Sequence, residues 1–185
     1  MTNKLWLAAL LLVGCSVVAL SYAQEARLRV DQLNYLSSRA KESVDVTMER
    51  PAVQLLAKLT ALDAREQNRF RELAQRIQGV YVRAFEFERE GEYSASDVES
   101  VRAQLRSWQR LALLRERGGE SNEVYYVTRN DVMEGMAVIT AEPRRLCVAN
   151  IVGQMTLDDL SLLDREFGVT SCGKDHKGQR ERVRR

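Results

Sequence analysis

The side chains that most often carry catalysis are scarce in this chain. Of its 185 residues only His176 is a histidine, and it lies in a polar C-terminal stretch. A Ser/His/Asp or Cys/His nucleophile would therefore depend on a residue outside the predicted core. The sequence has no HExxH, paired CxxC, EF-hand or P-loop spacing. We therefore expect a protein that is not an enzyme and that carries no metal or other cofactor.

Three polar residues in otherwise apolar surroundings remain as candidate site positions. Glu142 lies at a predicted turn; it could do acid–base work with a second acid, but a turn residue paired with Arg144 or Arg145 is the favoured interpretation. Asn150 interrupts an apolar strand and must be hydrogen-bonded if it is buried, which favours a structural role. Arg83 either extends its alkyl chain along an apolar surface, the preferred interpretation, or contacts an anion.

The cysteines are candidates for a structural disulfide rather than for a metal or redox site. Once an N-terminal leader is removed, Cys147 and Cys172 are the two that remain. In an exported protein they can form a disulfide, which the chain-entropy model values at about 3 kcal/mol. The alternative is a buried thiol in a strand and an unrelated thiol near the tail. Their spacing matches no metal or redox motif.

The N-terminus has the pattern of an export signal. A short basic start, Met1–Lys4, precedes the apolar run Leu5–Leu20, and small residues then lead to a cleavage site after Ala23, so that the mature chain begins at Gln24. Alternatively, the letters LVGC ending at Cys15 resemble a bacterial lipobox, with Cys15 lipidated. An uncleaved anchor is the third alternative, although the run is slightly shorter than the ~18–20 residues that span a bilayer.

The C-terminal end has a local excess of positive charge. Residues 174–185 hold six basic and two acidic side chains, a local charge of +4, whereas the whole chain has a formal charge of +2. This tail is predicted to be disordered, to contact an anionic membrane surface or to bind an acidic partner. Nucleic acid is a poor fourth partner, because export and the lack of interleaved aromatic residues argue against it.

The stretch Gly135–Gly153 predicts the centre of the fold. Two apolar strands are joined by a turn at Glu142–Arg145, and both faces of each strand are apolar, which is typical of strands covered by other layers. Four consecutive strands between residues 110 and 152, linked by short turns, must be antiparallel.

The remaining elements complete one domain over residues 24–173. Helices are expected over 29–41, from Pro51 with an apolar stripe of Ala52, Leu55, Leu56, Leu59 and Leu62, over 64–78 with a cap at Gly79, from Ser94 to Trp108, and over 156–167; further strands are expected over 43–48 and 80–87. We therefore predict an α+β two-layer sandwich, mainly an antiparallel sheet with helices mostly on one face. The strand order does not follow from the sequence.

Several segments together resemble the DUF4252 family. They are the stretches 42–47, 79–87, 141–143 and 150–153, Tyr93 with Asp97, Trp108, and Phe167-Gly168. The resemblance spans about Glu25 to Val169. It implies a single α+β domain of an exported bacterial protein of unknown function, located in the periplasm of a Gram-negative bacterium or anchored in the membrane as a lipoprotein. It implies no catalytic residues.

Three functions from different classes follow. The leading expectation is a non-catalytic envelope module that binds an envelope protein or surface component through an exposed sheet face or edge. The alternative is a domain that holds a small molecule or lipid between its sheet and helices. The third is a carboxylate-dependent hydrolase that uses Glu142.

Overall fold

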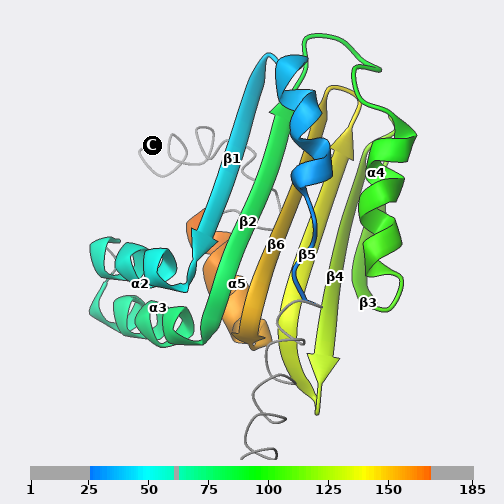
Figure 1. The fold of residues 1–185 in the computed structure, drawn as a ribbon. Helices are drawn as coiled ribbons and strands as arrows, with labels where there is room; N and C mark the ends of the chain where they lie inside the picture. Colours follow the sequence, from blue (N-terminus) through cyan, green and yellow to red (C-terminus); the bar gives the residue numbers. More distant parts are fainter. Residues whose placement is uncertain (1–25, 61–62, 168–185) are drawn as a thin grey trace, which may run out of the picture.

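A single antiparallel sheet forms the centre of the protein. The computed structural model describes residues 26–60 and 63–167, with side chains through residue 163. Six strands lie in the order β1-β2-β6-β5-β4-β3, and every neighbouring pair is antiparallel (Figure 1). Their bounds are β1 Glu42–Glu49, β2 Ile77–Glu86, β3 Gln109–Arg115, β4 Ser121–Arg129, β5 Val132–Glu142 and β6 Arg145–Met155. The described chain thus leaves β1 and β3 at the two edges.

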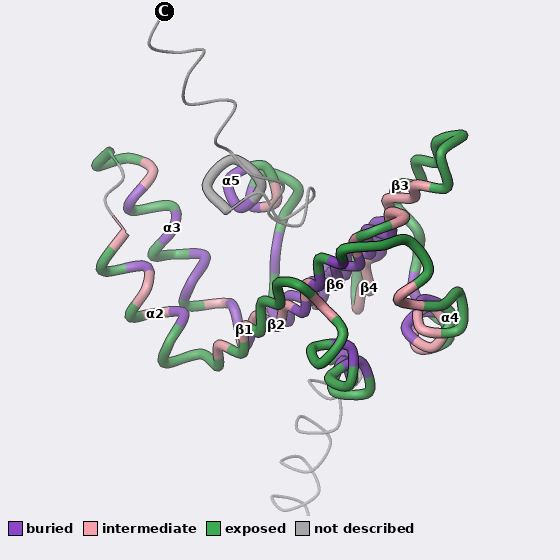
Figure 2. The backbone as a smooth tube through the Cα atoms, turned by 90° about the horizontal axis from the view of Figure 1, so that it is seen from above, coloured by how far each residue is buried: buried purple, intermediate pink, exposed green. Residues whose placement is uncertain are grey.

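Helices cover parts of both faces of this sheet. Three α-helices, α2 (Arg50–Leu59), α3 (Ala64–Arg76) and α5 (Leu157–Phe167), pack on one face. The 3-10 helix η1 (Asp31–Ser38), α4 (Ala95–Arg102) and the 3-10 helix η2 (Ala103–Leu105) cover the other (Figure 2). The α+β class and the antiparallel sheet are confirmed; helices lie over both faces of the sheet, and each face has its own apolar core.

Local sequence signals determine most of the turns and caps. Asn130 and Asp131, between β4 and β5, both have positive φ, as a two-residue hairpin turn requires. Ser94, where the sequence predicts that a helix begins, forms a capping box with Asp97 at the start of α4. The Asp159 amide donates to the Thr156 hydroxyl and the Thr156 amide donates to the Asp159 carboxylate, so these two residues form a capping box at the start of α5. These signals could be predicted because each depends on residues only a few positions apart.

Three local predictions were wrong. The first helix is the 3-10 helix η1, shorter than residues 29–41. Gly79 does not cap a helix, because α3 passes directly into β2; instead its missing side chain makes room for the phenol ring of Tyr81, which occupies the space that a Cβ would need. In α2 the buried residues are Val53 and Ala57, whereas Leu59 of the predicted stripe is 72% exposed.

The predicted leader and tail lie outside the described residues. They include Cys15, Ala23, Gln24, Cys172, His176 and residues 174–185. Among the described helices, none combines the length and apolar composition needed to cross a bilayer.

Candidate functional site

An apolar groove lies between the helices and the sheet on the α2–α3–α5 face. Its volume is about 370 Å³. Its floor is made by alternate side chains of three strands, because successive residues of a strand point to opposite faces. These floor residues are Val44, Val46 and Met48 of β1, Val80, Val82 and Ala84 of β2, and Ala149 and Ile151 of β6.

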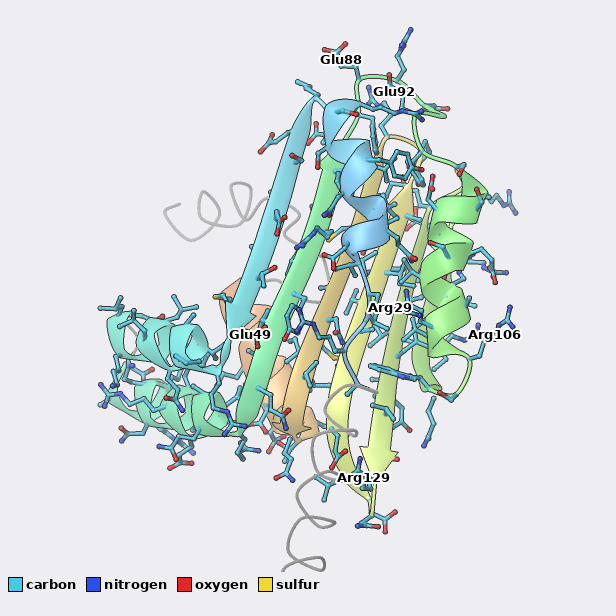
Figure 3. The ribbon with its side chains drawn as sticks, in the orientation of Figure 1. Arg29, Glu49, Glu88, Glu92, Arg106 and Arg129 are labelled. Carbon is cyan, nitrogen blue, oxygen red and sulfur yellow. The ribbon has the colours of Figure 1, made fainter. Side chains whose placement is uncertain are left out.

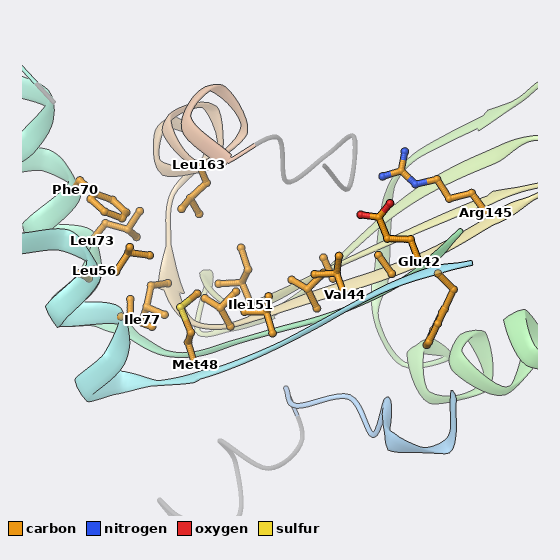
Figure 4. A pocket seen from close by; sticks show the side chains of 18 of the residues that line it. Glu42, Val44, Met48, Leu56, Phe70, Leu73, Ile77, Arg145, Ile151 and Leu163 are labelled. Carbon is orange, nitrogen blue, oxygen red and sulfur yellow. The ribbon is translucent and has the colours of Figure 1, made fainter. Parts of the chain in front are cut away.

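Helices form the walls of this groove. Leu56 of α2 and Phe70 and Leu73 of α3 stand on one side, and Leu163 of α5 lies across from them (Figure 4). Helices α2 and α3 extend beyond β1 while α5 lies over β6, so the sheet between them is left uncovered by the described helices (Figure 2). The groove is therefore a consequence of where the two groups of helices dock.

The charged residues among the described lining gather at one end. They are Glu42, Glu86 and Arg145, and they lie opposite one another on β1, β2 and β6. The Glu42 carboxylate and the Arg145 guanidinium point toward one another at this end (Figure 4). From Glu42 to Met48 the groove follows β1 over a length of about 20 Å at ~3.3 Å per residue. The lining is thus a long apolar channel with a polar end, and its described residues include no histidine, cysteine or serine.

Asn150 has a structural role, as the sequence favoured. It is fully buried in β6 on the opposite face, where its Oδ1 accepts from the Leu28 amide at 2.9 Å. Its Nδ2 donates to the carbonyls of Ala26 at 3.1 Å and Met136 at 3.0 Å. A strand side chain therefore takes the place of a backbone partner for the segment that enters the fold.

Arg83 is buried rather than extended into water. Only 6% of the residue is exposed, on the η1 face of β2. Its guanidinium forms ion pairs with Asp31 at 3.3 Å and Asp45 at 2.5 Å, and Nε donates to Asn34 at 3.2 Å. Because these partners come from η1 and β1, Arg83 connects the helix to the edge strand. The guanidinium is thus occupied within the protein.

Glu142 lies at the end of β5, opposite Arg145, as expected of a turn residue. Its carbonyl accepts from the Tyr93 hydroxyl at 2.5 Å. Burial, followed by the nearby Glu142 carboxylate, raises the pKa of Tyr93. Glu142 lines a second, polar hollow of about 570 Å³ with residues such as Glu88 and Arg144. Figure 3 shows Glu88 and Glu92 at this end of the molecule and Arg129 at the other.

Sequence reasoning missed a buried charged cluster on the η1–α4 face. Glu123 of β4 is 1% exposed. Its Oε1 accepts from Arg102 Nε at 2.9 Å, and its Oε2 accepts from the Tyr125 hydroxyl at 2.6 Å. Burial raises the pKa of Glu123, but hydrogen bonds from Arg102 and Tyr125 outweigh it and hold the pKa below its usual value. The alternation of Glu123 and Tyr125 on one strand was the available signal.

Cys147 lies on the groove side of β6, between Arg145 and Ala149. It is fully buried and disulfide-bonded. The predicted partner, Cys172, is outside the described residues, so this pairing stays a prediction. Within the described ranges, no three His, Cys, Asp or Glu residues are grouped closely enough to hold a metal ion.

The fold and groove define a small antiparallel α+β protein whose helices leave an apolar channel on one face of the sheet. The model of a domain of unknown function, DUF4252, matches residues 35–163. The chain belongs to the DUF4252 family. No curated protein and no solved structure matches it.

Proposed function

We propose that this protein is a non-catalytic binding protein of the bacterial cell envelope that holds a single-chain amphiphile in the groove. The observation that carries this proposal is an apolar channel of about 370 Å³ with its charges confined to one end. Small-molecule sites typically have volumes of about 300–1,000 Å³ and apolar linings with a few polar groups. Of the functions that the sequence left open, the groove favours ligand binding over a protein-interaction module.

The shape of the groove specifies the ligand class. An extended acyl chain can lie along the strands over the side chains of Val46, Val82 and Ile151. There the acyl chain is removed from water and contacts only apolar side chains. Each buried methylene contributes about 0.8 kcal/mol. A charged head cannot enter this part, because desolvation without a partner is costly. The head therefore lies at Glu42 and Arg145, whose opposite charges suit a zwitterionic group.

Two further observations support the envelope location. The N-terminal pattern up to Ala23 is that of an export signal. Cys147 is buried and disulfide-bonded, and structural disulfides are typical of exported proteins. A binding protein of this kind would shield the apolar chain of a lipid in an aqueous compartment.

The proposal is tested with palmitoyl lysophosphatidylethanolamine, a zwitterionic single-chain lipid, below its micelle concentration. We expect the mature chain to bind one molecule, as measured by calorimetry and native mass spectrometry. Leu56→Trp places a large ring in the groove and should weaken binding at least tenfold. Leu55→Trp is the matched control, because Leu55 is the preceding residue of α2 but is exposed.

Equal affinities for the two tryptophan variants would refute the groove as the site. The role of the polar end is tested separately with Arg145→Gln. This substitution should weaken binding of the zwitterionic lipid but leave binding of a neutral monoacylglycerol of the same chain length unchanged. Unchanged binding of both lipids would remove the headgroup assignment while retaining the channel.

A further inference from the structure

The edge strand β3 carries an exposed row of leucines. Leu111, Leu113 and Leu114 are 50%, 36% and 59% exposed. In the described part of the chain, no strand pairs with the outer side of β3, so its backbone amides and carbonyls are available along that side. Natural proteins usually protect such an edge with charges, proline or a covering element, because an apolar edge recruits another strand. The middle of β3 has none of these devices.

The opposite edge, β1, has the complementary character. It carries Glu42, Asp45 and Glu49 and no basic residue, whereas β3 carries Arg110 and Arg115 and no acidic residue. Asp45 and Glu49 already contact Arg83 and Arg27 within the chain, but their side chains remain 63% and 57% exposed. Each can therefore accept a second cation from outside.

We infer that β3 of one copy pairs with β1 of the next, so that copies of this chain extend one continuous sheet. The topology supports this directly. Because six strands alternate in direction, β1 and β3 run in opposite directions, and a copy placed beside β3 continues the antiparallel order with the same face up. The contact is heterologous, since it joins two different surfaces, and it generates a ring or an open chain of copies.

One register satisfies both the charges and the apolar side chains. Leu113 and Arg115 of β3 point to the η1–α4 face, as do Asp45, Thr47 and Glu49 of β1. Placing Arg115 opposite Asp45 puts Leu113 opposite Thr47. Beyond them, the bulge at Leu111 brings Arg110 opposite Glu49. Both arginines then face carboxylates across the new pair of strands.

The other face of the same register is apolar. Leu114 lies opposite Val46, and Ala112 lies opposite Met48, on the side of the sheet that carries the groove. Cross-strand pairs of this kind, apolar with apolar and acid with base, are those that stabilise a sheet. A β3–β3 pair of two copies would instead bring together two edges that both carry arginines. The charges thus favour the head-to-tail contact.

Sedimentation of the mature chain over a range of concentrations tests the inference. We expect masses above that of the monomer that rise with concentration. The Leu114→Lys variant should not form the larger species. The Leu157→Lys variant is the control, because Leu157 is a comparably exposed leucine on α5, and it should assemble like the wild type. Unfolding temperatures measured by circular dichroism establish that the variants are folded. A wild type that stays monomeric, or equal loss in both variants, would overturn the inference.

A mixing experiment distinguishes the head-to-tail contact from β3–β3 pairing. Arg115→Glu alone and Asp45→Arg alone should each be monomeric, because each places like charges across the contact. Their mixture should assemble, since opposite charges again face each other where β1 of the Asp45→Arg variant meets β3 of the Arg115→Glu variant, and the other contact of the mixture keeps Arg115 opposite Asp45. Failure of two folded variants to assemble on mixing would overturn the proposed register. The experiment contains no lipid and is independent of the proposed ligand.

Discussion

At the scale of single residues, the polar groups that first suggested chemistry are used to hold the fold together. Asn150 and Arg83 both lie on the η1 face, where they bind the entering segment and η1. Their burial could be anticipated from the apolar residues beside them, but their partners could not. Those partners lie more than 120 positions away for Asn150 and about 50 for Arg83.

The buried amide of Asn150 gives the first prediction. Asn150→Ala removes three hydrogen bonds and leaves the buried Leu28 amide and Ala26 carbonyl unpaired, which should lower the free energy of unfolding by about 2–4 kcal/mol. Gln104→Ala is the control, because Gln104 bonds the backbone of Arg29 in the same segment at an exposed position and should cost less than about 1 kcal/mol. Urea unfolding measures both, and equal losses would contradict the assigned role.

The Glu123 cluster predicts a pH dependence. Hydrogen bonds from Arg102 and Tyr125 outweigh the effect of burial and lower the folded-state pKa of Glu123. The unfolded value is about 4.3. The stabilisation is therefore fully present above about pH 4.3 and is lost as the pH falls through the folded-state pKa. Glu123→Gln, which does not titrate, should be less stable than the wild type at pH 7, and this difference should shrink on acidification. A difference independent of pH would contradict the prediction.

At the scale of elements, the sequence predicted what depends on neighbours in the chain. The β5–β6 hairpin, the β4–β5 turn at Asn130 and the capping box at Ser94 follow from period-two patterns and turn residues. Which side of α2 packs against the sheet could not be predicted from the sequence. Its leucines are spaced to form one stripe, but the helix lies at the edge of the sheet and docks through Val53 and Ala57. Helical periodicity identifies an apolar stripe without showing which part of it finds a partner.

This difference makes α2 and α3 a direct test. Leu73 of α3 is fully buried between the helix and the sheet, so Leu73→Ala should cost about 2–5 kcal/mol. Leu59, which the sequence placed inward, is 72% exposed, and Leu59→Ala should change stability by less than about 0.5 kcal/mol. Chemical denaturation measures the free energy of unfolding of both variants, in which the same side-chain atoms are removed. A large loss for Leu59→Ala would show that α2 docks through the predicted stripe.

At the scale of the whole molecule, the groove lay beyond sequence reasoning because it requires the strand order. Strand β2 comes early in the chain but pairs with β6, which leaves β1 at the edge and brings the early helices α2 and α3 and the late helix α5 to the same face of the sheet. No local pattern encodes that long-range pairing. The lining residues each had an ordinary explanation as core, and only their arrangement leaves space between them.

The last prediction concerns where the mature molecule begins. Ala26 is buried and bonded to Asn150, so the fold starts by this residue. Cleavage after Ala23 leaves two residues before it, whereas a lipidated Cys15 would be followed by ten. We predict that the intact mass of the mature protein corresponds to a chain that begins at Gln24, and that the protein is found in the periplasmic fraction. The Cys15→Ala substitution should change neither result. A mass that corresponds to a lipidated chain beginning at Cys15, together with protein in the membrane fraction, would contradict this prediction. It would also place the groove close to the membrane from which its proposed ligand comes.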